Sequence, residues 1–199
     1  MEHSLLASVI DSTKLTSDTS EQCDAIVIGS GAGGAVLAKE LAAGGMKVII
    51  LEEGGYHPQE THKDMPYKAV RRLYRNRGYT STLSIPAIPI PLGRAVGGTT
   101  LINSGTCFKT PDNIFEEWKE KFQLHDLVGS DFNTFFARVE KEINVEPASY
   151  SVMSRANTIL HEILTAKKMP GEPLRRNIKD CEGCGFCCYG CPSGAKQSM

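Results

Sequence analysis

Two short runs of aliphatic residues bracket a helix-forming segment near the start of the chain. The runs Ala25–Ile28 and Val48–Leu51 contain no polar residue, as expected of strands that other elements cover on both faces. Between them, residues 35–43 are rich in helix formers, and Gly44 and Gly45 then favour a left-handed helix stop. The pattern predicts a β-α-β unit of about thirty residues, and therefore a parallel sheet.

Further along the chain, segments with helical spacing alternate with irregular stretches. Residues 56–82 are basic and aromatic, and we expect a helix there followed by an irregular segment. Three prolines in residues 84–93 exclude a helix and a central strand, so this stretch must run extended. Helical spacing returns in residues 111–122, 131–143 and 152–168, and the first of these segments begins with Pro111 and Asp112.

Composition and charge are those of an ordinary globular protein. Hydrophobic residues make up 41% and charged residues 23% of the 199 residues. The 22 basic and 23 acidic residues nearly balance, and no stretch is strongly basic, so we expect no nucleic-acid partner. Residues 1–22 form a polar lead without the features of a secretory signal, and no apolar run could span a bilayer. We therefore expect a soluble, cytoplasmic protein.

A glycine-rich turn directly after the first predicted strand has the spacing G-x-G-x-x-G. At a helix N-terminus, free backbone amides and the positive end of the helix dipole favour a pyrophosphate, and side chains would block its approach. Glu52 ends the second strand, where its carboxylate can accept both ribose hydroxyls of an adenosine and would repel the 2′-phosphate of NADP. A turn that binds nothing is the alternative, and FAD or NAD would both fit. The candidate binding residues of the turn are Gly29, Ser30, Gly31, Gly33 and Gly34.

A second glycine loop occurs in the stretch GRAVGGTTLIN. Gly97 and Gly98 would let the backbone approach a ligand closely, while Thr99 offers a hydroxyl. Arg94 offers a permanent cation near a phosphate. Taken alone, the loop is equally well explained as a glycine hairpin.

Together, the segments IVIGSGAGGAVLAKELA, VIILEEGG and GRAVGGTTLIN resemble the glucose-methanol-choline (GMC) family of FAD-dependent oxidoreductases. The resemblance implies that FAD is the cofactor and that the second glycine loop approaches its pyrophosphate. Some members carry a flavin-linking histidine at the position of Ile102, so we expect FAD to bind non-covalently. The residues that the resemblance places at the pyrophosphate are Gly97, Gly98 and Thr99, and those beside the isoalloxazine are Asn103, Gly105 and Thr106.

The family resemblance implies an α/β fold, a Rossmann-like FAD-binding domain with a parallel sheet and flanking helices. We expect residues 23–199 to be the N-terminal part of this domain, with the catalytic residues beyond residue 199. The implied activity is oxidation of a CH–OH group by hydride transfer to flavin, with an electron acceptor that the sequence does not indicate. The spacing from Asn103 to Pro111 is similar to that of long-chain fatty alcohol oxidases, which implies a long-chain or otherwise apolar alcohol, with a sterol as second choice.

The segment 181–191 holds five of the seven cysteines. Its C-x2-C-x2-C-x3-C-P spacing matches bacterial ferredoxins, which makes a [4Fe-4S] cluster and an iron-sulfur electron-transfer module the alternative. Such runs usually occur in pairs, however, and a zinc ribbon needs knuckles further apart. We therefore expect no metal and a turn in which Cys187 and Cys188 are small buried hydrophobes. An inactive nucleotide-binding remnant is a further alternative. The four cysteines with the ferredoxin spacing are Cys181, Cys184, Cys187 and Cys191.

Overall fold

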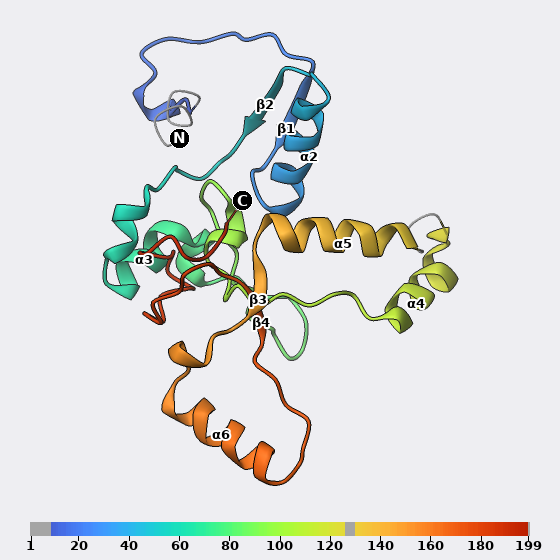
Figure 1. The fold of residues 1–199 in the computed structure, drawn as a ribbon. Coiled ribbons are helices and arrows are strands. Elements are labelled where there is room, and N and C mark those ends of the chain that lie inside the picture. The colour runs from blue at the N-terminus through green and yellow to red at the C-terminus, as the bar shows by residue number, and fades with distance from the viewer. Residues whose placement is uncertain (1–8, 126–129, 199) are drawn as a thin grey trace. The chain divides into compact units, whose positions relative to one another are not determined.

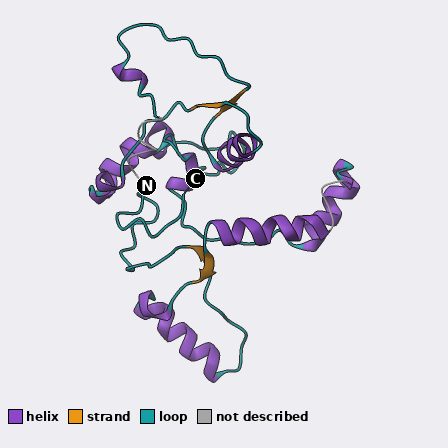
Figure 2. Ribbon diagram, turned by 45° about the horizontal axis from the view of Figure 1, so that its top comes forward, coloured by secondary structure: helices purple, strands orange, loops and turns teal. Residues whose placement is uncertain are grey.

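The computed structural model describes residues 9–125 and 130–198. These residues fall into two compact units, one ending at Ile102 and the other running from Asn103 to Ser198. Helices and loops make up most of the described chain, and the strands are short (Figure 2).

A parallel β-α-β unit forms the N-terminal part of the first unit (Figure 1). Strands β1 (Ala25–Ile28) and β2 (Val48–Leu51) pair in parallel along their whole length, and helix α2 (Ala32–Ala43) connects them. The predicted strands and the α/β class are confirmed. Helix α2 begins three residues earlier than predicted, so that Gly33 and Gly34 belong to its first turn.

The burial of these two strands is lower than predicted. Val27 is buried, but Ile26 is 61% and Ile28 is 86% exposed, so the expectation of strands covered on both faces is wrong for this chain. Among the described residues, β1 pairs with β2 alone, and helix α2 contacts both strands. No other part of the described chain therefore covers the side chains that alternate away from Val27.

In the rest of the first unit, the chain folds back towards the end of β2. Helix α3 (Pro66–Leu73) has Pro66 in its first turn and buries Leu73, and the predicted irregular segment follows it. Residues 84–93 contain no helix, as predicted, but residues 83–86 form the bend of a hairpin, in which the Ile90 amide donates to the Thr80 carbonyl at 2.8 Å. Short 3-10 helices in this unit are η1 (Ser12–Lys14), η2 (Gln59–Lys63), η3 (Arg75–Gly78) and η4 (Gly98–Leu101).

The second unit contains three helices that the sequence predicts and two strands that it does not. Most ends of its helices α4, α5 and α6 lie within two residues of the predicted ends. The exception is the start of α6, which lies three residues after the predicted start because Ser154 caps the helix. The unpredicted strands β3 and β4 are antiparallel and only three residues long. The elements are α4 (Asp112–Phe122), α5 (Ser130–Glu142), β3 (Val145–Pro147), η6 (Tyr150–Val152), α6 (Arg155–Ala166) and β4 (Arg175–Asn177).

Helices α4 and α5 share an aromatic core. The ring of Phe115, which is buried, lies 5.2 Å from that of Phe132 and 6.3 Å from that of Phe136. These are edge-to-face and tilted contacts of the kind that aromatic rings prefer.

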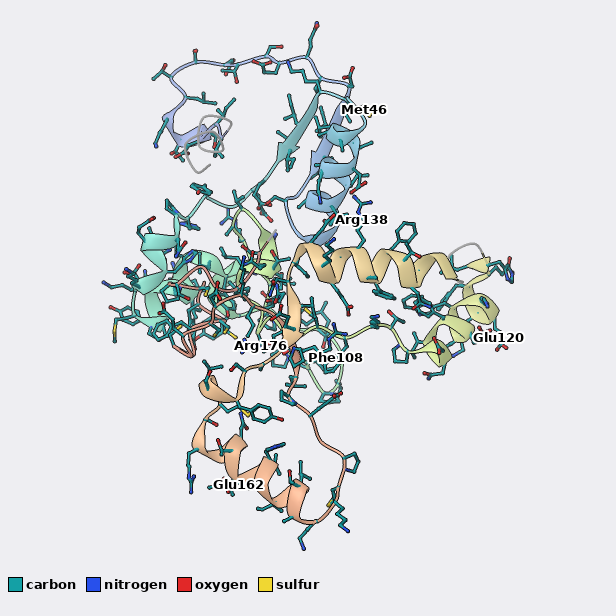
Figure 3. All side chains as sticks on the ribbon, viewed as in Figure 1. Met46, Phe108, Glu120, Arg138, Glu162 and Arg176 are labelled. Atoms are coloured by element: carbon teal, nitrogen blue, oxygen red, sulfur yellow. The ribbon has the colours of Figure 1, made fainter. Side chains whose placement is uncertain are left out.

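Side chains project from all the elements, as Figure 3 shows. Within the described residues, every helix is too short or too polar to cross a bilayer.

Candidate functional site

The glycine turn of the first unit is tied to the end of strand β2. The Gly29 amide donates to the Leu51 carbonyl at 2.8 Å, which starts the turn at the carboxyl ends of both parallel strands. Ser30 is buried, and its amide and hydroxyl donate to Glu52 Oε2 at 2.9 and 2.7 Å. The Gly54 amide donates to the other carboxylate oxygen at 2.8 Å. Glu52 thus fixes the glycine turn against the chain that leaves β2.

These hydrogen bonds determine the charge state of Glu52. Burial acts to raise the pKa of its carboxyl group, but the donors from Ser30 and Gly54 outweigh burial and hold the pKa below its usual value. The side chain is therefore a carboxylate at neutral pH. A carboxylate has about four lone-pair sites, and these three bonds leave capacity for a further donor such as a ribose hydroxyl.

Ser30 also joins the two glycine loops. Its Oγ accepts a hydrogen bond from the Gly97 amide at 3.0 Å. A Cβ atom at Gly98 would lie 3.1 Å from Gly31 Cα, so the two loops are in direct contact. Gly97 and Gly98 both have left-handed φ angles, +91° and +54°, which glycine adopts without strain. The expectation that two loops far apart in sequence meet in space is confirmed.

The turn leaves room where a phosphate group would approach. Side chains built at Gly29, Gly31 or Gly33 would meet no atom within 4 Å. Gly31 is the N-cap of α2 and contributes no side chain to the first amides of the helix. Open space, unblocked amides and the positive end of the α2 dipole fit the pyrophosphate of a dinucleotide. The predicted cation, Arg94, forms an ion pair with Glu53, its Nε 3.6 Å from Oε2.

The other predicted residues belong to the second unit. Asn103 folds back on its own loop, its Oδ1 accepting from the Gly105 amide at 3.0 Å. This loop lies beside strand β4, since Thr106 bridges to Arg176 and the Asn177 amide donates to the Gly105 carbonyl at 3.0 Å. Strand β4 therefore positions the segment that the family resemblance assigns to the isoalloxazine. The two glycine loops form the candidate site of the first unit, and this segment is a candidate site of the second unit by itself.

Lys196 connects the Asn103 loop to the cysteine-rich segment. It is 5% exposed, and its Nζ donates to the Asn103 carbonyl at 2.8 Å and to the Cys187 carbonyl at 2.7 Å. Burial lowers the pKa of Lys196 to about 8, and the positive charge of Arg176 adds to this, although nearby thiols act to raise it.

The lowered pKa of Lys196 predicts a pH dependence of stability. Between about pH 8 and pH 10.5, the unfolded chain binds more protons at this lysine than the folded chain does, so the free energy of unfolding must rise with pH. We expect the wild type to gain about 1–3 kcal/mol relative to the Lys196→Met variant across this range. Urea unfolding of both proteins at several pH values measures the gain. A difference that does not change with pH would contradict it.

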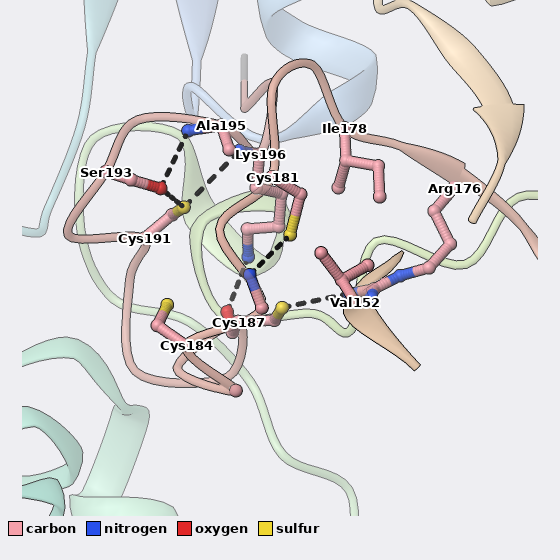
Figure 4. Close-up of a pocket in the computed structure, with 12 residues that line it drawn as sticks. Val152, Arg176, Ile178, Cys181, Cys184, Cys187, Cys191, Ser193, Ala195 and Lys196 are labelled. Carbon is pink, nitrogen blue, oxygen red and sulfur yellow. Dashed lines mark hydrogen bonds between the residues drawn. The ribbon is translucent and has the colours of Figure 1, made fainter. Parts of the chain in front are cut away.

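The cysteine-rich segment forms a cavity of about 100 Å³ (Figure 4). The prediction that Cys187 and Cys188 are buried hydrophobes is wrong, because Cys188 is exposed and Cys187 is half-buried with a hydrogen bond from Arg176. No group of three or more metal-ligating side chains in the described part of the chain is placed to hold a metal ion. All four cysteines with the ferredoxin spacing, Cys181, Cys184, Cys187 and Cys191, line the cavity.

Sequence analysis missed several residues that hold the loops together. A Cβ atom at Gly54 would lie 2.2 Å from the Ala95 amide nitrogen, and one at Gly93 would lie 2.3 Å from the Gly98 carbonyl oxygen. Both glycines allow the second loop to pack closely. The sequence signal that could have identified Gly54 and Gly93 is that both lie close to candidate site residues. The sequence around Lys196, in contrast, gives no indication of its distant partners.

The parallel unit, its glycine turn and the acidic end of β2 define a dinucleotide-binding protein of the α/β class. Residues 24–63 match the model of an FAD binding domain, and residues 70–199 match that of the GMC oxidoreductases. The chain belongs to the GMC oxidoreductase family, and it corresponds to the FAD-binding N-terminal region of that family.

Relatives of this chain occur in bacteria and plants. An uncharacterised GMC-type oxidoreductase of Mycobacterium tuberculosis is 38% identical over 176 residues, which are 88% of this chain and 28% of the relative. Long-chain-alcohol oxidase FAO4A of Arabidopsis thaliana is 34% identical over 177 residues, covering 88% of this chain and 24% of the plant protein. The chain thus spans about a quarter of the length of these two relatives.

A more distant relative and a solved structure extend the comparison. Cholesterol oxidase of Acinetobacter baumannii is 24% identical and aligns with 88% of this chain and 36% of its own length. The structure of a formate oxidase of Aspergillus oryzae aligns with 49% of this chain and 19% of its own, with 24% identity and a TM-score of 0.38.

Proposed function

We propose that this chain is the FAD-binding part of an enzyme that oxidises the CH–OH group of an alcohol. One observation carries the cofactor assignment: Ser30 donates to Glu52 and accepts from the Gly97 amide, so that the two glycine loops meet at an acidic residue. When bound, FAD accepts the hydride that leaves the alcohol. The substrate assignment draws on the relatives named as long-chain-alcohol oxidases.

The residues of the first unit bind and orient the cofactor in this proposal. The amides at the start of α2 would hold the pyrophosphate, together with the backbone at Gly97 and Gly98. Glu52 would accept a ribose hydroxyl, and it disfavours a cofactor with a 2′-phosphate. Ile102 is buried and aliphatic, with no nucleophilic atom to offer the flavin, which supports non-covalent binding.

The second unit contains the residues that the family resemblance assigns to the flavin ring. Asn103, Gly105 and Thr106 lie on the segment that β4 and Lys196 hold in place. We assign this segment to the isoalloxazine because of the family resemblance. The base that removes the hydroxyl proton is proposed to lie outside these 199 residues, and the substrate to be a long-chain or otherwise apolar alcohol, with a sterol as second choice.

FAD binding by the purified chain tests the cofactor assignment. We expect FAD to bind with quenching of its fluorescence, and the Glu52→Gln variant to bind about tenfold more weakly, because it loses charge-assisted hydrogen bonds. NADP should not compete with FAD, since Glu52 repels its 2′-phosphate. Far-UV circular dichroism of both proteins verifies that they are folded. A folded chain that does not bind FAD would overturn the assignment.

The substrate assignment needs a separate measurement. Anaerobic addition of a long-chain primary alcohol to the flavin-loaded native gene product should bleach the flavin absorbance. If short polar alcohols bleach it and long-chain alcohols and sterols do not, the substrate class is wrong while the cofactor assignment stands.

A further inference from the structure

The cavity of the cysteine-rich segment combines thiols with positive charge, and the proposed hydride transfer uses neither. Four thiols of one short segment and two cationic side chains from β4 and the C-terminal residues face the same space (Figure 4). Cations close to thiols favour the thiolate, which is the reactive form of cysteine. The residues concerned are Cys181, Cys184, Cys187, Cys191, Arg176 and Lys196.

One of these cysteines has a cation fixed against its sulfur. Arg176 Nη2 donates to Cys187 Sγ at 2.9 Å. The same guanidinium also donates to the Ser104 carbonyl, from Nε at 3.2 Å and from Nη2, and its backbone belongs to strand β4. A guanidinium is always charged in proteins, so Cys187 has a permanent, positioned counter-ion.

A second cysteine in the cavity is also prepared for reaction. Burial acts to raise the pKa of the Cys191 thiol, but hydrogen bonds from Ser193 and the Lys196 amide outweigh it and lower the pKa. The Lys196 ammonium group lies close by, where it donates to the Cys187 carbonyl. The cavity therefore contains one thiol with a cation at its sulfur and another whose thiolate is stabilised.

We propose that Cys187 is a peroxide-reactive cysteine that is oxidised to a disulfide with another cysteine of this cavity. Cys187 Sγ attacks one oxygen of hydrogen peroxide, the O–O bond breaks, and the departing hydroxide takes up a proton to become water. Cys187 is then a sulfenic acid. The thiolate of the second cysteine attacks Cys187 Sγ, the S–S bond forms, and the second oxygen leaves as water. Two thiols lose two electrons and peroxide gains them.

The proposal does not depend on FAD binding. Solvent exposure alone would predict a different order of cysteine oxidation. Cys184 and Cys188 are exposed, whereas Cys187 is half-buried and therefore less accessible to solvent. If access alone controlled oxidation, the two exposed cysteines would react first. If the Arg176 cation controls it, Cys187 reacts first.

Trapping of the sulfenic acid with dimedone tests the order of reaction. The reduced chain is treated with substoichiometric hydrogen peroxide, and labelled peptides are quantified by mass spectrometry. We expect labelling of Cys187 to exceed that of Cys184 and Cys188 about tenfold, Arg176→Gln to reduce it about fivefold or more, and Arg176→Lys to restore most of it. A Cys23→Ser variant, altered in the first unit, should label Cys187 like the wild type.

Without dimedone, the same treatment should remove two hydrogen masses from the chain, and digestion should locate a disulfide at Cys187. The Cys187→Ser variant should form no such disulfide. Labelling of Cys187 that does not exceed that of Cys184 and Cys188, unchanged labelling in Arg176→Gln, or a sulfenic acid that never resolves would each overturn the proposal. So would stoichiometric iron or zinc on these thiols in the purified protein, because metal-bound sulfur would be their resting state.

Discussion

Replacing Gly34 by alanine is expected to lower the free energy of unfolding by about 3 kcal/mol. A Cβ atom at this position would lie 2.0 Å from the Gly29 carbonyl oxygen and 3.2 Å from Val27 Cγ1. The first contact involves backbone, so helix α2 would have to move away from the turn that precedes it. Urea unfolding measures the loss as a shift of the midpoint. The same displacement should weaken FAD binding, because it moves the amides at the helix N-terminus.

Gly33 provides a matched control one residue away. It belongs to the same helical turn, but a Cβ atom there would meet nothing within 4 Å. Gly33→Ala should therefore leave stability unchanged or raise it by up to about 1 kcal/mol, because alanine is the better helix former. Equal losses in both variants would show that the close approach at Gly34 does not limit stability.

The Gly105→Ala variant is expected to lose about 2–4 kcal/mol of stability in the second unit. Gly105 has a φ of +74°, and a Cβ atom would lie 2.7 Å from Asn177 Oδ1. Asn177 cannot easily give way, because it is buried and its side-chain amide donates to the Gln197 carbonyl. The substitution should therefore disturb both strand β4 and the loop assigned to the isoalloxazine. Urea unfolding again provides the measurement.

Gly185 separates the two causes of this loss. Its φ is also +74°, but nothing lies within 4 Å of a Cβ atom built there. Gly185→Ala should thus show only the backbone strain of a left-handed alanine, about 1–2 kcal/mol. If Gly105→Ala lowers the free energy of unfolding no more than Gly185→Ala does, the contact with Asn177 contributes nothing to the loss.

Local patterns predicted the elements that a short stretch of sequence determines. The two aliphatic runs and the helix formers between them sufficed for the β-α-β unit, and the spacing of glycines together with Glu52 indicated the candidate dinucleotide site. Strands β3 and β4 were missed because three residues are too few to show a periodicity.

The parts of the site that depend on distant partners could not be predicted from spacing. Ser30 and Gly97 are 67 positions apart, and Lys196 and Asn103 are 93 apart. The family resemblance brought the two glycine loops together but gave no role to Lys196. The burial of both Cys187 and Cys188 was predicted wrongly, and for Cys187 the reason is that the usual preference of free cysteine for the core took no account of the arginine on β4.

The uncovered side of strand β1 has a consequence for handling this polypeptide. Its outer backbone edge has no ladder partner among the described residues, and Ile26 and Ile28 project into water beside it. An unpaired strand edge with aliphatic neighbours is a template for pairing with a second copy. Concentrated solutions of the isolated 199-residue polypeptide are therefore prone to intermolecular sheet formation, which a charged substitution at Ile28 would oppose.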